Sequence, residues 1–231
     1  MSKEIDNIFV DVRNAFRLLH NYQERVLQIV SYIREQTPFN DMWGKKDWFS
    51  AEIGKRRNSP DSDYAKLSVS KDMWGWDFLY GYFFEYYFGF EVISKKKVEM
   101  SIFQVSDDGF FISTQEKKLM NKTSCFAPSE LSHSYLILNA SIYTTEYTEL
   151  WLTDPSYPDD EYVDFLSRFL SSPLDINIFR NDKGEVALIK KYDMQRFTSQ
   201  LEADAVIRDF GRIVKNETGI ELFKHNFYED L

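Results

Sequence analysis

A single aromatic stretch, residues 76–92, constrains the fold of this chain more than any other part of the sequence. It reads WDFLYGYFFEYYFGFEV, and every second position from Trp76 to Phe90 is aromatic, with Val92 next in the series. Side chains of an extended chain alternate between two faces. A helix would scatter these rings around its circumference, so the period of two predicts a β-strand with one aromatic face.

The aromatic stretch is also too long to be one regular strand, because it would span more than about 50 Å. Gly81 and Gly89 lie within it, and a glycine inside a strand often marks a bulge or bend. We therefore expect a bend, bulge or break at one of them. The aromatic residues up to Phe90 are expected to share one core face. The intervening positions include Glu85, which becomes a candidate site if it is buried.

Residues 4–36 carry the clearest helical pattern. Apolar side chains recur every seven residues in two series, one from Ile5 and one from Ile8, and Phe9, Phe16 and Val30 widen the stripe. Such a stripe predicts a long amphipathic helix. Its width favours packing on a sheet, and the narrower alternative is a coiled-coil seam that would make a dimer. Thr37-Pro38 should end the helix, because the residue before a proline disfavours the helical conformation.

Residues 38–63 read as a long connection that is rich in aromatic and basic side chains. Long loops in compact domains are often functional. Aromatic side chains beside arginines can anchor a protein partner or stack on bases. The alternative is that the tryptophans plug the edge of the sheet while the charges remain in water. The candidate binding residues are Trp43, Trp48, Arg56 and Arg57, together with Trp74 further along the chain.

Residues 64–153 form the predicted sheet-rich core. After the aromatic strand, Lys95 to Lys97 are expected to form a turn. Alternation around Met100 predicts the next strand, and Asp107-Asp108-Gly109 predicts a hairpin turn before a strand at residues 110–114. Residues 136–142 alternate again, and short strands are expected at residues 64–70 and 145–153.

Residues 159–231 should form a helix, a hairpin and a last helix. Asn181–Gly184 predicts the hairpin turn. Ser199 and Glu202 have the spacing of a capping box, and Gly219 has the character of a C-terminal cap. The predicted fold is therefore a single α+β domain, with a mixed or mostly antiparallel sheet of about six to eight strands, a long N-terminal helix and two further helices.

Composition excludes several classes of protein. The net charge is −9, which argues against general nucleic-acid binding, because phosphates require a basic surplus. The lone Cys125 excludes an intramolecular disulfide and a cysteine-based zinc site. The N-terminus lacks the apolar segment of a signal peptide, and no long apolar run is present. The expectation is a cytoplasmic protein without a membrane segment, and the bias toward Phe, Tyr, Ile, Asn and Lys suggests a bacterial source.

One carboxylate pattern resembles the core of restriction-endonuclease-like nucleases. Asp108 precedes Glu116 and Lys118, an E-x-K spacing that in those enzymes holds a divalent metal. The pattern departs from the usual layout, because Asp107-Asp108-Gly109 is better explained as a turn. The three histidines, His20, His133 and His225, have no metal-ligand spacing.

These observations predict a non-enzymatic protein that binds another macromolecule, with a protein as the expected partner and no cofactor or metal. The monomer and the homodimer both remain open. Two alternatives belong to other classes. One is the metal-dependent nuclease that uses Asp108, Glu116 and Lys118. The other is a small-ligand-binding domain with a cleft beside the aromatic strand.

Overall fold

The structure is a computed structural model that describes residues 2–45, 83–113, 123–144 and 168–228. Helix α1 (Ser2–Glu35) begins the chain and follows the amphipathic pattern of the sequence. The helix ends where predicted, just before Thr37. The Thr37 hydroxyl donates a hydrogen bond to the carbonyl of Arg34 over 2.6 Å. Pro38 follows and disfavours continuation of the helix.

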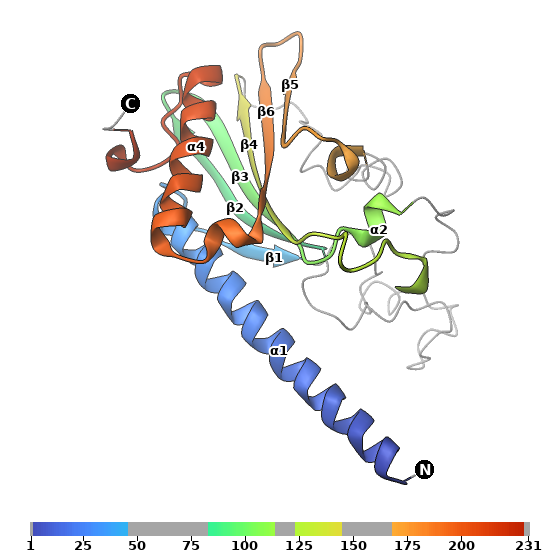
Figure 1. Ribbon diagram of the computed structural model, residues 1–231. Helices are drawn as coiled ribbons and strands as arrows, with labels where there is room; N and C mark the ends of the chain where they lie inside the picture. Colours follow the sequence, from blue (N-terminus) through green and yellow to red (C-terminus); the bar gives the residue numbers. More distant parts are fainter. Residues whose placement is uncertain (1, 46–82, 114–122, 145–167, 229–231) are drawn as a thin grey trace, which may run out of the picture.

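The sheet is antiparallel throughout its described part. Five strands make up most of it: β2 (Phe83–Ile93), β3 (Lys96–Val105), β4 (Tyr135–Tyr143), β5 (Ile176–Arg180) and β6 (Val186–Asp193). The three-residue β1 (Trp43–Lys45) adds to the edge of β2. The order is β1-β2-β3-β4-β6-β5 (Figure 1). The predicted α+β class is confirmed. The predicted count of six to eight strands also depended on residues 64–70 and 145–153, which lie outside the described residues.

The aromatic strand is interrupted at Gly89, as its length required. Gly89 has a φ of +83°, and the register between β2 and β3 shifts between Tyr87 and Phe90. One extra residue in β2 makes this a β-bulge. Residues 76–82, including Gly81, lie outside the described residues.

The bulge overturns the prediction that Phe90 shares the core face. Phe84, Tyr86 and Phe88 are buried in the core, whereas Phe90 and Val92 are 59% and 69% exposed. An extra residue reverses the alternation of side chains, because the side-chain period of a strand is two. Phe90 pairs with Glu99 and therefore lies on the opposite face from Phe88.

A second correction concerns the segment after β3. The sequence predicted a hairpin turn at Asp107–Gly109 and a strand at residues 110–114. The structure instead has the short helix α2 (Gly109–Ile112), with Asp108 as its N-cap residue. The 3-10 helix η5 (Thr123–Cys125) comes before β4. The β2–β3 turn is also earlier than predicted, at Ser94 and Lys95, which both have positive φ.

The C-terminal part agrees closely with the sequence patterns. Residues 168–171 are helical, the β5–β6 hairpin turns at the predicted residues, and η6 (Met194–Phe197) leads into α4 (Gln200–Thr218). Ser199 caps α4 by accepting a hydrogen bond from the Glu202 backbone, and Gly219 ends it with a φ of +75°. The 3-10 helix η7 (His225–Phe227) follows.

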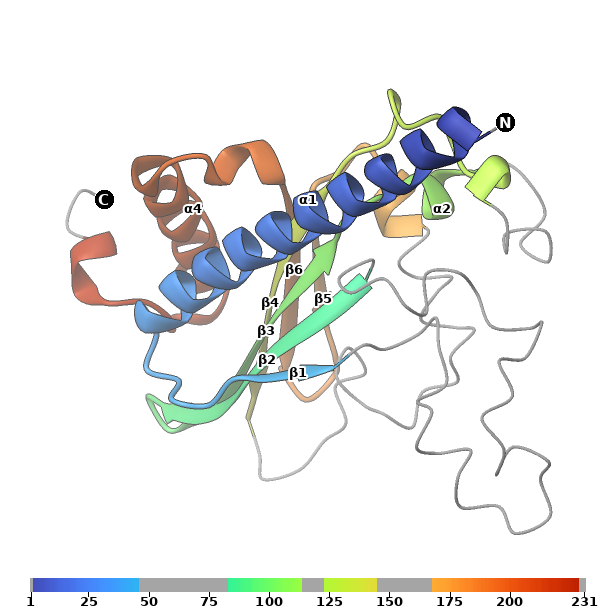
Figure 2. The ribbon, with the colours of Figure 1, turned by 90° about the horizontal axis from the view of Figure 1, so that it is seen from below.

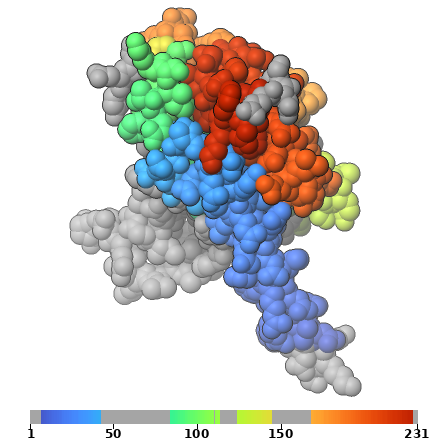
Figure 3. Space-filling view, turned by 90° about the vertical axis from the view of Figure 1, so that its left-hand side faces the viewer, coloured from blue at the N-terminus to red at the C-terminus, as the bar shows by residue number. Residues whose placement is uncertain are grey.

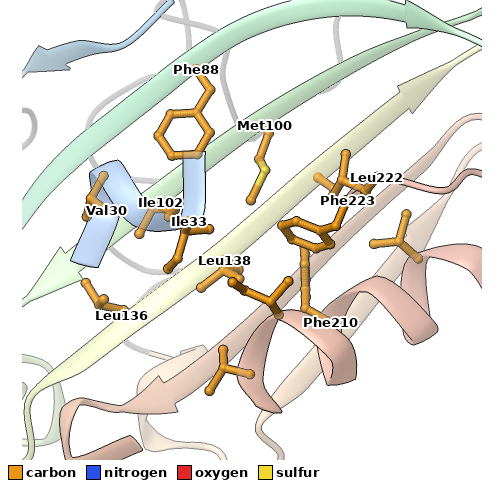
Figure 4. Packing of buried hydrophobic residues seen from close by; sticks show 14 of the residues in the cluster. Val30, Ile33, Phe88, Met100, Ile102, Leu136, Leu138, Phe210, Leu222 and Phe223 are labelled. Atoms are coloured by element: carbon orange, nitrogen blue, oxygen red, sulfur yellow. The ribbon is translucent and has the colours of Figure 1, made fainter. Parts of the chain in front are cut away.

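The main core lies between one face of the sheet and the two helices α1 and α4 (Figures 1 and 2). Val30 and Ile33 of α1 approach Ile102 and Leu136 of the sheet, while Phe210 of α4 packs beside Phe223 (Figure 4). Among the α1 side chains that the structure describes, those in this core lie in the C-terminal part of the helix, from Tyr22 onward.

Candidate functional site

The N-terminal half of α1 projects from the body of the protein. Residues 7–21 are all exposed, and they rise about 22 Å along the helix axis. Figures 1 and 3 show this part as a narrow stalk that extends beyond the sheet. The prediction that α1 packs on the sheet therefore holds for its C-terminal part and is wrong for the stalk.

One apolar stripe runs along both halves of α1, but only half of it is buried. Val26, Ile29, Val30 and Ile33 are at most 6% exposed. Positions seven or fourteen residues earlier lie on the same face of the helix, yet Phe16 is 65% exposed and Leu19 is 42% exposed. We call this exposed part the projecting stripe; it comprises Ile8, Phe9, Val12, Ala15, Phe16 and Leu19.

Hydrogen bonds fix the helix at the point where the stalk begins. The Nε2 atom of Gln23 donates to the hydroxyl of Tyr86 over 2.7 Å, and that hydroxyl donates to Oε1 of Gln104 over 2.7 Å. The Nε2 atom of Gln104 donates back to Gln23 over 3.2 Å. One turn of polar contacts therefore separates the buried part of the stripe from the exposed part.

A second feature is a layer of buried polar side chains on the opposite face of the sheet. Glu85 and Glu99 are 5% and 7% exposed. Ser101 donates to Glu85 over 2.8 Å, and Tyr143 donates to Glu99 over 2.9 Å. Lys97 forms an ion pair with Glu99 over 2.7 Å. Glu85 is therefore buried, which is the condition under which the sequence analysis made it a candidate site. Its face of the sheet holds a hydrogen-bonded network.

Two side chains beside this network have no partner among the described residues. Both amide atoms of Asn139 and the hydroxyl of Ser141 are buried without a hydrogen bond. Asn139 pairs across the strands with Ser101, and Ser141 pairs with Glu99. Leaving such groups unpaired is costly, and ordered water is their usual partner. This layer therefore contains polar groups in need of hydrogen bonds.

A pocket of about 350 Å³ lies at the end of β6, away from the described part of the aromatic strand. Its charged groups are largely engaged with one another. Lys190 and Tyr192 both bond to Asp209, and burial raises the pKa of Tyr192. Lys191 donates to three backbone carbonyls at residues 169, 170 and 172, and burial lowers its pKa. The pocket lining carries three basic and three acidic side chains and favours no one charge of ligand: His133, Tyr135, Asp175, Lys190, Lys191, Tyr192, Asp193, Arg196 and Asp209.

Asp108, the first residue of the nuclease pattern, has a structural role in the fold. It is 1% exposed, and its Oδ1 accepts a hydrogen bond from the His133 backbone over 2.7 Å. Burial raises the pKa of this carboxyl group. Glu116 and Lys118 lie outside the described residues, so the complete pattern stays a prediction. Within the described part, no three His, Cys, Asp or Glu side chains form a group that could hold a metal ion.

The aromatic and basic candidates fall mostly outside the described residues, which applies to Trp48, Arg56, Arg57 and Trp74. The backbone of Trp43 lies in β1, opposite Tyr87. The binding role predicted for this segment stays a prediction. The sequence pattern identified every member of the projecting stripe, but it assigned them to the core. The same heptad pattern of apolar residues continues into Val26, Ile29, Val30 and Ile33, which are buried.

The fold defines an α+β protein with an antiparallel sheet, two covering helices and an exposed helical stalk. Residues 2–219 match the PM0109 family, and the chain belongs to that family. No curated protein and no solved structure matches the chain. None of the described helices combines the length and apolarity needed to cross a bilayer.

Proposed function

We propose that this protein works by binding another protein chain through the projecting stripe of α1. The observation that carries the proposal is the contrast along one helix face: Val30 is fully buried, and Phe16, fourteen residues earlier, is 65% exposed. A contiguous exposed apolar patch is typical of an interaction surface. Burial of a large apolar side chain contributes about 1.5–3 kcal/mol. A complex in which the partner covers Phe9, Phe16 and Leu19 would therefore be substantially stabilised.

Two further properties support a protein partner. The stripe extends along about three turns of the helix, from Ile8 to Leu19, which suits an apolar surface or a second helix. The stalk is anchored by Gln23 and Tyr86 to a packed sheet, so the partner would meet an ordered helix and would not have to order it. The acidic chain as a whole does not favour nucleic acid.

Site-specific photo-crosslinking in cells tests the proposal. A photoreactive amino acid would replace Phe16 in one variant and Asn14 in the matched control. Asn14 is exposed on the same turn of α1 but lies off the stripe. The proposal expects a discrete protein adduct from position 16 and a much weaker one from position 14. Equal labelling at both positions, or no adduct at position 16, would contradict it.

A further inference from the structure

We infer that the partner of the projecting stripe is a second copy of this chain, bound through an antiparallel pair of α1 stalks. This inference rests on the proposed function and names its partner. It starts from the spacing of the stripe. Val12 and Leu19 occupy one heptad position, and Ile8 and Ala15 occupy the other, which is the arrangement that lets two helices interlock side chains along a seam.

The stripe is complementary to itself when the two helices run in opposite directions. Such a pairing sets Ile8 opposite Leu19 of the second copy and Val12 opposite Ala15. The symmetry of a dimer repeats both contacts. A large residue then lies beside a small one at the centre, as close packing requires. Phe9 of one copy and Phe16 of the other flank the seam on the side where the stripe is broad.

The charges of the stalk favour the same arrangement. Residues 3–20 contain three basic and three acidic residues, so the stalk has no net charge. The three acidic residues and Lys3 precede Val12, which leaves that half with a net charge of −2, whereas Arg13 and Arg17 follow it and give the other half +2. Along the helix axis, an antiparallel pair therefore brings the acidic half of each stalk level with the basic half of the other, and it opposes the helix dipoles. A parallel pair would align like charges.

The acidic body of the protein supplies an independent argument. Because the stalk is neutral, the net charge of −9 belongs to the remainder of the chain. The body lies at one end of the stalk (Figure 1). A parallel pair would bring two acidic bodies together, where they would repel each other. An antiparallel pair places them at opposite ends of the seam.

Sedimentation equilibrium of the full chain, from low micromolar to about 200 µM, tests the partner. The wild-type chain is expected to dimerise reversibly. Phe16→Glu and Leu19→Glu should each weaken dimerisation at least about tenfold, with unchanged circular dichroism and thermal unfolding. Val10→Glu is the matched control: Val10 is an exposed apolar residue of the same stalk, but it faces away from the stripe, so dimerisation should persist.

A purely monomeric wild-type chain would overturn the inference, and so would equal weakening by Val10→Glu and Leu19→Glu. A monomer whose position 16 still crosslinks to a different protein would overturn the second-copy inference while leaving the proposed function intact. A monomer without any crosslink at position 16 would contradict both.

Disulfide trapping tests the direction of the pair. Ile8→Cys and Leu19→Cys would be introduced into separate, differently tagged chains in which Cys125 is replaced by serine. The antiparallel pair is expected to form the mixed disulfide between position 8 and position 19 when the two chains are combined. Disulfides that join only identical positions would show a parallel pair and overturn the antiparallel assignment.

Discussion

Gln23 of α1 and Tyr86 of β2 share a 2.7 Å hydrogen bond at the point where the helix leaves the sheet. Tyr86 in turn bonds to the fully buried Gln104. Residues 7–21, which precede this contact, are exposed on every side of the helix, and after the contact the apolar face is covered. The polar contact therefore sets where the stalk begins and holds it at a defined angle to the sheet.

Replacing Tyr86 by phenylalanine should destabilise the protein. The substitution keeps the ring in the core but removes the hydroxyl that donates to Gln104. We expect a loss of about 1–3 kcal/mol in the free energy of unfolding, because Gln104 loses its best donor in a buried site. Urea unfolding measures this loss. Gln23→Ala should show a coupling with Tyr86→Phe of at least about 0.5 kcal/mol; strictly additive effects would show that the contact is absent in solution.

The bulge at Gly89 predicts unequal costs for three phenylalanines in one strand. Phe84→Ala and Phe88→Ala remove buried rings, so each should cost about 3–5 kcal/mol. Phe90→Ala should cost less than about 1 kcal/mol, because this ring is largely in water. The same urea experiment compares all three. A loss at Phe90 as large as that at Phe88 would mean that β2 continues without a bulge.

The buried carboxylate of Glu85 should be sensitive to small changes. Ser101 donates to it in a site that is closed to water. Ser101→Ala should cost about 1–3 kcal/mol, the range for removing the partner of a buried polar group. Glu85→Gln should also cost more than Glu91→Gln, a change in the same strand at a partly exposed position. Equal and small effects for the two glutamates would place Glu85 at the surface.

Asp108 predicts a dependence of stability on pH. Burial raises its pKa in the folded protein, while hydrogen bonding to His133 and the charge of that histidine oppose the shift. The unfolded chain has the lower pKa, so ionisation is easier when the protein is unfolded. Stability contributed by the protonated group is thus present at low pH and is lost as the pH rises through the raised pKa.

Asp108→Asn keeps an oxygen that can accept from the His133 backbone but cannot ionise. The difference in unfolding free energy between wild type and Asp108→Asn should therefore shift in favour of the wild type as the pH falls from 7 to about 4. Urea titrations at a series of pH values follow this difference. A shift in the opposite direction would mean that Asp108 is ionised more readily in the folded protein.

Local sequence patterns predicted the regular elements well. The heptads of α1, the alternation of β4, the turn at Asn181–Gly184 and the Ser199 cap each depend on residues close together in the chain. The helix α2 was missed because Asp107-Asp108-Gly109 has the same composition as a hairpin turn. The contact that decides between them is the bond from the His133 backbone to Asp108, which joins residues 25 apart in the sequence.

The candidate site was harder to predict than the fold. An apolar stripe has the same appearance in sequence whether it meets a sheet or a partner, so nothing distinguished Phe16 from Val30. The difference depends on where the sheet ends along the helix. The network around Glu85 and Glu99 was equally hidden, because its members come from β2, β3 and β4, and only the pairing of those strands brings them together.

The extra residue at Gly89 reverses which face of the sheet each later side chain of β2 reaches. Up to the bulge, alternate rings (Phe84, Tyr86 and Phe88) lie on the helix-covered face. Beyond it, this series continues on the other face with Phe90, where the Lys97 ammonium group lies 4.7 Å from the Phe90 ring centre. One aromatic sequence therefore serves two surfaces with different chemistry. Deleting a single glycine would exchange the surfaces reached by every side chain beyond it, without changing one of those residues.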